Sequence, residues 1–164
     1  MPKIIAVVGG KHSGKTTIIE NLITELKSRG YTVGVIKEMV RIPTLDTPQT
    51  ETDRYAQAGA EKIVAVPRTE TVIFIKKRLT IQEILPHLED LDYAFLEGFE
   101  HEKFVHKIVA AKNFEEAQSF MDDSVVAVSG LIMESAKERS KAFILNVPLF
   151  SSLTHADKLA DLIK

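Results

Sequence analysis

The stretch VVGGKHSGKTTIIENL, residues 7–22, decides how this chain folds. Apolar residues 4–8 run into a pair of glycines, which is typical of a short strand buried in a parallel sheet. From residue 16 to 29, apolar side chains recur every three or four positions and predict an amphipathic helix. Residues 31–36 predict a second strand. Strand, helix and strand in this order predict a right-handed βαβ unit.

The turn between the first strand and the helix has the spacing of a phosphate-binding loop. Gly9 and Gly14-Lys15-Thr16 match the P-loop pattern G-x-x-x-x-G-K-[ST]. In such a loop, backbone N–H groups surround the β-phosphate, the lysine adds positive charge, and the threonine hydroxyl suits Mg²⁺. The helix that follows directs its positive end at the same anion. We therefore expect a nucleoside triphosphate to bind at Gly9, Gly10, Lys11, His12, Ser13, Gly14, Lys15, Thr16 and Thr17.

A carboxylate follows another apolar strand, at residues 92–96. Glu97 ends this strand and Gly98 follows, at the carboxyl edge where open α/β sheets bind ligands. P-loop enzymes hold Mg²⁺ with help from a carboxylate of a neighbouring strand. We therefore expect Glu97 to act at Mg²⁺ or the nucleotide; the alternative is a solvated glutamate at a strand end. Phe99 and Phe104 flank the loop that follows and suit a dimer interface, a partner contact or simple packing.

The loop of residues 37–49 and the helix expected after it offer further charged candidates. The loop is too long for a plain connector, and the preceding strand brings its start near the P-loop. Asp46 is a candidate for holding a Mg²⁺-bound water. Glu51 either does the same or stabilises the start of the helix. Arg54, one turn later, either reaches a phosphate or pairs with Glu51.

The remaining pattern alternates strands and helices without a linker or an internal repeat. Residues 62–66 and 71–75 surround a turn and predict a hairpin. Further strands are expected at 105–111, 125–128 and 143–145, and further helices at 50–58, 80–88 and 154–163, the last capped by Thr154. The expected fold is α/β, a P-loop NTPase-type three-layer sandwich with a mostly parallel sheet, helices on both faces and a β-hairpin insertion. We expect one nucleotide-binding domain over residues 1–164.

Composition excludes several classes of function. With 164 residues, a net charge of -2 and a pI near 6.2, the chain lacks the basic character of a nucleic-acid-binding protein. It has no cysteine, which excludes disulfides and thiolate metal sites. No apolar run approaches the roughly 18 residues of a membrane helix, and the N-terminus does not have the pattern of a signal peptide. We expect a cytoplasmic protein without membrane or nucleic-acid partners.

These segments together resemble the molybdopterin-guanine dinucleotide biosynthesis protein B (MobB) family of P-loop GTP-binding proteins. The resemblance begins at VVGGKHSGKTTIIENLITELKSRGYTVGVIK and continues through LDTPQTETDRYAQAGA, LDYAFLEGF and HKIVA to VPLFSSLTHADKLADLI. The P-loop by itself is generic, and the order of the RGY, AGA and LEGF segments makes the resemblance specific. The chain departs from the family pattern at Glu38, at residues 49–51 and at His106, where the family has histidine, Gly-Lys-Asp and proline.

The resemblance implies roles for individual residues. It implies Lys15, Arg54 and Glu97 as catalytic residues, and Thr16, Asp46 and Glu97 as the residues that hold Mg²⁺. It implies GTP as the nucleotide, with weak hydrolysis. It also implies an adaptor role beside a partner molybdopterin guanylyltransferase, which joins GMP to molybdopterin. Molybdopterin is a further candidate ligand, and a homodimer is expected.

Hydrolysis rate and base choice are weakly encoded in the residues themselves. No water-orienting glutamine stands beside the P-loop, and Arg54 is the one candidate for a catalytic arginine, so intrinsic hydrolysis should be slow. The guanine-binding pattern Asn-Lys-x-Asp is absent, so the preference for GTP over ATP rests on the resemblance. Residues 128–130 and 146–148 follow late strands and are candidates for reading the base.

Two other functions remain open from the sequence. A kinase acting on a nucleotide or another small molecule would share the P-loop, but would need an arginine-rich lid that the chain does not show. A nucleotide-gated assembly chaperone for a metal centre would share it as well. The absence of cysteine argues against delivery of a thiolate-bound metal, although oxygen and imidazole ligands are still available.

Overall fold

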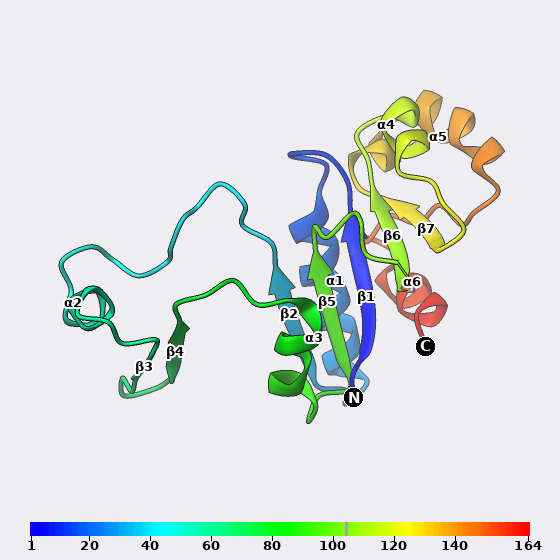
Figure 1. Cartoon of the computed structure of the whole chain (residues 1–164). Coiled ribbons are helices and arrows are strands. Elements are labelled where there is room, and N and C mark those ends of the chain that lie inside the picture. The colour runs from blue at the N-terminus through cyan, green and yellow to red at the C-terminus, as the bar shows by residue number, and fades with distance from the viewer. Residues whose placement is uncertain (104) are drawn as a thin grey trace. The chain divides into compact units, whose positions relative to one another are not determined.

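The computed structural model describes residues 1–103 and 105–164, so the expectation for Phe104 lies outside the described residues. The chain divides into two compact units, residues 1–38 with 87–164 and residues 39–86 (Figure 1). The first unit carries the P-loop and a five-stranded sheet, and the second carries a two-stranded hairpin. One nucleotide-binding domain over residues 1–164 stays a prediction.

The sheet of the first unit has the strand order β2-β5-β1-β6-β7, and each neighbouring pair is parallel. Its strands are β1 Lys3–Val8, β2 Val33–Lys37, β5 Tyr93–Glu97, β6 His106–Ala110 and β7 Val125–Ser129. Central β1 places Val7 opposite Glu97 on one side and Val8 opposite Val109 on the other. The P-loop therefore leaves the sheet at its carboxyl edge, between the ends of two neighbouring strands. The mostly parallel sheet confirms the expected α/β class.

Helices of the first unit pack against apolar side chains of the sheet. The helices are α1 Lys15–Ser28, α4 Phe114–Ser119, α5 Ala136–Ala142 and α6 Ala156–Leu162, with 3₁₀ turns η2 Leu131–Glu134 and η3 Phe143–Leu145. A further 3₁₀ turn, η1 Leu85–Leu88, has its first two residues in the second unit and its last two in the first. Leu22 and Leu26 of α1 pack with Leu159 of α6 against one face of the sheet, and all three are fully buried. Each such leucine stabilises the fold by roughly 1.5–3 kcal/mol. On the opposite face, the Leu88 and Leu91 side chains cover Gly34 of β2.

The helices of the first unit are short. Its longest helix, α1, has 14 residues and a mixed polar and apolar surface. Over residues 1–103 and 105–164, no helix is both long enough and apolar enough to cross a membrane.

The second unit consists of α2 Glu51–Gln57, β3 Lys62–Ala65, β4 Val72–Ile75 and α3 Ile81–Ile84. Strands β3 and β4 pair antiparallel, which confirms the expected hairpin. The side chain of Thr50 accepts a hydrogen bond from the Asp53 N–H and caps α2. Thr80 and Glu83 form a capping box at the start of α3. Helix α3 passes directly into η1, so the helical segment expected at residues 80–88 is confirmed as two short pieces.

One predicted strand is wrong. Residues 143–145 form the turn η3, which ends at Asn146 with a left-handed φ of 55°. The Phe143 and Ile144 side chains are 73% and 72% exposed, so neither faces the sheet. The position beside β7 is taken by Leu149, which forms an isolated parallel bridge with Val128. The apolar residues Phe143 and Ile144 therefore belong to a surface turn, and Leu149, which follows the turn, is the residue that pairs with β7.

The expected cap of the last helix is also wrong. Helix α6 begins at Ala156, and His155 occupies the N-cap position without a side-chain hydrogen bond. The Thr154 hydroxyl lies 2.8 Å from Nδ1 of the His155 ring instead. Because this contact is local to the turn, Thr154 cannot satisfy the free N–H groups of the first turn of the helix.

An ion pair between a buried lysine and a half-exposed aspartate connects β6 to the turn before β7. The Lys107 side chain is 6% exposed, and its ammonium donates to Asp122 Oδ2 at 2.7 Å. The Ser124 hydroxyl and N–H donate to the other oxygen of this carboxylate. The Lys107 ammonium, with help from Ser124, lowers the pKa of Asp122 from 3.8 to about 2. A buried ammonium without this carboxylate would lack its charged partner.

Replacing Asp122 with asparagine should therefore destabilise the chain near neutral pH. The loss should be about 1 kcal/mol, at the low end for a charged hydrogen bond because Asp122 is half exposed. Because the folded pKa is depressed, the contribution is complete above about pH 4 and disappears as the pH falls through about 2. Urea unfolding at several pH values measures it, with Asp123→Asn as the exposed control. A stability difference that stays constant down to pH 2 would contradict the assignment.

Candidate functional site

The loop between β1 and α1 forms a concave nest of backbone N–H groups. The φ angle is positive at Gly9 (146°), His12 (60°) and Gly14 (101°), so the chain reverses its turn repeatedly within six residues. Such alternation directs successive N–H groups to one side and creates an anion-binding hollow. A Cβ atom added to Gly9 would lie 2.0 Å from the carbonyl oxygen of Ala110. Only glycine at this position allows the loop to lie against the end of β6.

Helix α1 presents a free N-terminus to this hollow. Gly14 is its N-cap, no side chain caps the helix, and its first turn contains no acidic residue. The first N–H groups of a helix have no partner inside the helix and carry part of its positive dipole. This end of α1 is therefore suited to bind an anion that lies in the loop.

The Lys15 ammonium closes over the same loop. Its Nζ donates to the carbonyl oxygens of Gly9 and Gly10 at 2.8 and 2.6 Å. The nest, the helix end and this ammonium border a hollow of about 490 Å³ lined by Lys11, His12, Ser13, Gly14, Lys15, Thr16, Thr17, Glu97 and Leu131. Of the nine residues expected to bind nucleotide, the seven from 11 to 17 line the hollow, and the carbonyl oxygens of Gly9 and Gly10 accept from Lys15, which lines it.

Glu97 and Thr16 meet at the edge of this hollow. Glu97 is the last residue of β5 and is 8% exposed. Its Oε1 accepts hydrogen bonds from the Thr16 hydroxyl at 3.0 Å and from the Lys37 ammonium at 2.9 Å. The two residues expected at Mg²⁺ from this unit thus lie in direct contact, although they are 81 positions apart in the chain.

Lys37 is a site residue to which the sequence patterns did not point. It ends β2 and lies opposite Glu97 in the parallel register between β2 and β5. The signal that could have found it is this pairing: two strands that end in opposite charges at the same edge of a sheet. Lys37 neutralises a buried carboxylate and fixes the position of its oxygen.

The residues at this edge fit a triphosphate with Mg²⁺. Hydroxyl and carboxylate oxygens are the donors that Mg²⁺ prefers, and it takes only one or two protein ligands when substrate phosphates supply the others. Within residues 1–103 and 105–164, no cluster of three or more His, Asp and Glu side chains is suited to a metal on its own. A metal at Thr16 and Glu97 would therefore depend on phosphate oxygens for the rest of its ligands.

Asp46 and Arg54 belong to the second unit. The Asp46 carboxylate is buried there and accepts from the Lys76 ammonium at 2.5 Å and from the Thr52 hydroxyl at 2.7 Å. These donors hold the pKa of Asp46 below its ordinary value. Arg54 is exposed on α2, and neither it nor Glu51 forms an ion pair with the other. The roles of Asp46 at Mg²⁺ and of Arg54 at a phosphate stay predictions.

A second hollow adjoins the phosphate loop. It has a volume of about 230 Å³ and shares Gly14, Thr17 and Leu131 with the first hollow. Its remaining lining residues are Ile18, Gly130, Met133, Glu134, Ser151, Ser152 and Leu153. Gly130 belongs to one of the two segments expected to read the base, and the other segment, residues 146–148, does not line this hollow.

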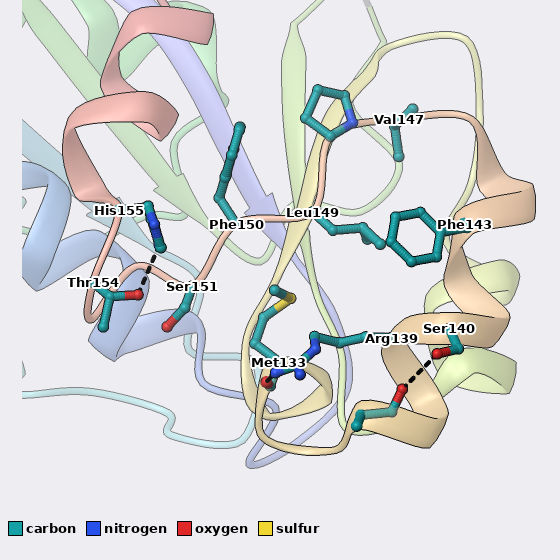
Figure 2. A pocket seen from close by; sticks show the side chains of 12 residues that line it. Met133, Arg139, Ser140, Phe143, Val147, Leu149, Phe150, Ser151, Thr154 and His155 are labelled. Carbon is teal, nitrogen blue, oxygen red and sulfur yellow. Dashed lines mark hydrogen bonds between the residues drawn. The ribbon is translucent and has the colours of Figure 1, made fainter.

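A third hollow of about 640 Å³ lies beyond the second and shares Met133 and Ser151 with it (Figure 2). Its wall comes from α5, η3 and residues 147–155. The Arg139 side chain points toward Met133, where its guanidinium donates to the backbone carbonyl (Figure 2). Val147 and Pro148 line this third hollow and no P-loop residue does, so it is separate from the phosphate site.

The chain matches a known protein family over most of its length. The family model for molybdopterin guanine dinucleotide synthesis protein B matches residues 4–130. A relative from Methanocaldococcus jannaschii, grouped with molybdopterin-guanine dinucleotide biosynthesis adapter proteins, is 31% identical over 131 residues. That match covers 77% of this chain and 54% of the relative, so the chain spans about half the relative's length. The Escherichia coli molybdopterin-guanine dinucleotide biosynthesis adapter protein is 27% identical over 146 residues, covering 79% of this chain and 78% of that protein.

Solved structures agree on the fold. The crystal structure of Bacillus subtilis MobB aligns with a TM-score of 0.77 and 20% identity, covering 99% of this chain and 98% of that one. The hydrogenase maturation factor HypB from Archaeoglobus fulgidus aligns with a TM-score of 0.53 and 11% identity, covering 92% and 79%. Because the family model matches well over half of its residues, the chain belongs to the molybdopterin guanine dinucleotide synthesis protein B (MobB) family.

Proposed function

We propose that this chain binds GTP with Mg²⁺ at its P-loop and serves as an adapter when GMP is attached to molybdopterin. The observation that carries the nucleotide part is the contact between Thr16 and Glu97 beside the nest and Lys15. The adapter part rests on family membership and on relatives that are named as biosynthesis adapter proteins. A homodimer and a cytoplasmic location belong to the same proposal, since the resemblance implies the first and composition the second.

Each residue of the site has a distinct task in this proposal. The nest and the N-terminus of α1 bind phosphate oxygens through N–H groups, and Lys15 moves from the loop carbonyls to the phosphates. Thr16 and Glu97 would hold Mg²⁺, directly or through water. When bound, Mg²⁺ would neutralise charge between the β- and γ-phosphates. Lys37 pairs with the Glu97 carboxylate and orients it.

Hydrolysis should be slow in the isolated protein. Hydrolysis needs a group that orients the attacking water, and a P-loop enzyme without its arginine finger loses about 10³–10⁵ in rate. Among the described residues that line the phosphate hollow there is neither a glutamine nor an arginine. We therefore infer a protein that holds GTP for a partner and turns it over weakly. The expected partner is a guanylyltransferase that uses molybdopterin as acceptor.

Replacing Lys15 with alanine should abolish triphosphate binding. The ammonium donates to two carbonyl oxygens of the nest and is placed to reach a phosphate there, so the loss should be at least about 100-fold in Kd for a charge-assisted phosphate contact. Isothermal titration with Mg²⁺ and GTP measures it. Lys27→Ala, in the last turn of the same helix, is the matched control and should bind as wild type. Equal affinity in wild type and Lys15→Ala would contradict the phosphate site.

Replacing Glu97 with glutamine should raise the Mg²⁺ concentration that is needed for tight GTP binding. The affinity for GTP without metal should stay as in wild type. The amide keeps the shape but removes the charge that suits a divalent ion and pairs with Lys37. The measurement is GTP affinity against Mg²⁺ concentration, with exposed Glu100→Gln as control. The midpoint for Mg²⁺ should rise about tenfold or more. An unchanged midpoint would show that Glu97 is not at the metal.

The adapter role is tested with a purified molybdopterin guanylyltransferase. Size-exclusion chromatography of the two proteins with GTP and Mg²⁺ should give a complex, and Lys15→Ala should lower its yield if nucleotide controls association. A chain that binds GTP but neither associates with the transferase nor changes its rate would contradict the adapter role and leave the nucleotide site intact.

A further inference from the structure

We propose that Glu134 reads the base of the bound nucleotide and selects guanine in the 230 Å³ hollow beside the P-loop. This inference rests on the proposed nucleotide site and adds the residue that determines its specificity. Glu134 lies beyond residues 4–130, the part of the chain that the family model matches. Four observations support the proposal: the continuity of the hollows, the anchoring of η2, the lack of a partner for Glu134 among the described residues, and the charge of its carboxylate.

The hollow is continuous with the phosphate site. Gly14, Thr17 and Leu131 line both hollows, so a nucleotide with phosphates in the nest has this space directly beside it. The third hollow, shown in Figure 2, is lined by no residue from the P-loop. Arg139 lines that third hollow, and its guanidinium donates to the Met133 carbonyl. The second hollow is therefore where the nucleoside of a bound triphosphate would lie.

The turn η2 that carries Glu134 is tied to the P-loop by backbone hydrogen bonds. The Leu131 N–H donates to the Ser13 carbonyl at 3.3 Å, and the Ile132 N–H donates to the Ala111 carbonyl at 2.8 Å. The Met133 carbonyl accepts from Arg139 on its other side. A site that must distinguish two bases needs its reading group held in place relative to the phosphates. These bonds fix the backbone of Glu134 relative to the nest.

The residue after Glu134 is anchored as well. The Ser135 hydroxyl accepts from the Glu138 N–H at 3.3 Å and caps α5. Glu134 thus lies between a turn bonded to the P-loop and a capped helix, and its side chain takes part neither in the bonds of the turn nor in the cap. Within the described part of the chain, no hydrogen bond or ion pair engages the Glu134 carboxylate.

The charge of this carboxylate favours guanine. Glu134 is the one acidic side chain among the described residues that line the hollow. An ionised carboxylate only accepts hydrogen bonds. Guanine presents two adjacent donors, its N1–H and its N2 amino group, whereas adenine presents an unprotonated N1 and no amino group at C2. A carboxylate can therefore pair with both donors of guanine, and it faces a lone pair in adenine.

A carboxylate that accepts from both guanine donors can select guanine even though the chain lacks the Asn-Lys-x-Asp pattern. Asn-Lys-x-Asp is absent from the sequence, so its aspartate does not supply the acceptor. Glu134 supplies a carboxylate from the turn that follows β7. Ser151, Ser152 and Leu153 also line the hollow, and backbone N–H groups are donors of the kind that the guanine O6 oxygen needs.

The test is the base preference of Glu134→Gln and Glu134→Ala, measured by titration of GTP, ATP and xanthosine triphosphate with Mg²⁺. Wild type should prefer GTP. Both variants should bind GTP about tenfold to hundredfold more weakly. Glu134→Gln should gain affinity for xanthosine triphosphate, because its amide can donate to the carbonyl that replaces the N2 amino group. Glu89→Gln, exposed and absent from the hollow, is the matched control and should keep the wild-type preference.

The outcomes separate this inference from the proposed function. Because Glu134 is exposed and has no partner among residues 1–103 and 105–164, both variants should unfold at the wild-type temperature, which a melting curve checks. Wild type that prefers GTP, together with an unchanged preference in Glu134→Gln, would overturn the inference alone. ATP preference in wild type would overturn it as well, while the triphosphate site stands. No binding of any triphosphate to wild type would overturn both.

Discussion

The contact between the P-loop and the end of β6 is the constraint on which the rest of the site depends. Gly9 lies so close to the Ala110 carbonyl that a single Cβ would overlap with it. This approach holds the loop at the carboxyl edge of the sheet and lets its N–H groups turn inward. With any other residue at position 9, the loop would have to move away from β6, and the nest and the start of α1 would move with it.

Parallel pairing then brings the other groups to the same edge. Strands β1, β5 and β2 are in parallel register, so Glu97 and Lys37 end side by side next to the loop. A carboxylate buried alone would be costly, and the ammonium of Lys37 and the hydroxyl of Thr16 offset that cost. The same contacts hold the carboxylate where a divalent ion beside bound phosphates would need it. The contacts that stabilise this edge of the sheet and the proposed metal site therefore involve the same three side chains.

Much of the fold and part of the site could be predicted from local patterns. The P-loop, its flanking strand and helix, the hairpin and Glu97 each have a short-range signal that the structure reproduces in space. Lys37 could not be found in this way, because its role comes from pairing between strands far apart in the sequence. Helices α4 and α5 were not predicted, since each spans only six or seven residues and their charged surfaces hide the apolar spacing. The strand expected at residues 143–145 is wrong because Phe143 and Ile144 are exposed on a turn. Aromatic and aliphatic residues are common in strands, and composition alone does not show whether they are buried.

We propose above all that a triphosphate lies in the nest between Lys15 and the N-terminus of α1. The most direct measurement is a ¹H–¹⁵N spectrum of the labelled protein recorded as Mg²⁺ and GTP are added. We expect the largest chemical-shift changes at the amides of residues 9–17, with further changes at Glu97 and Glu134. Saturable binding whose shifts avoid residues 9–17, or a spectrum that does not change at all, would contradict it.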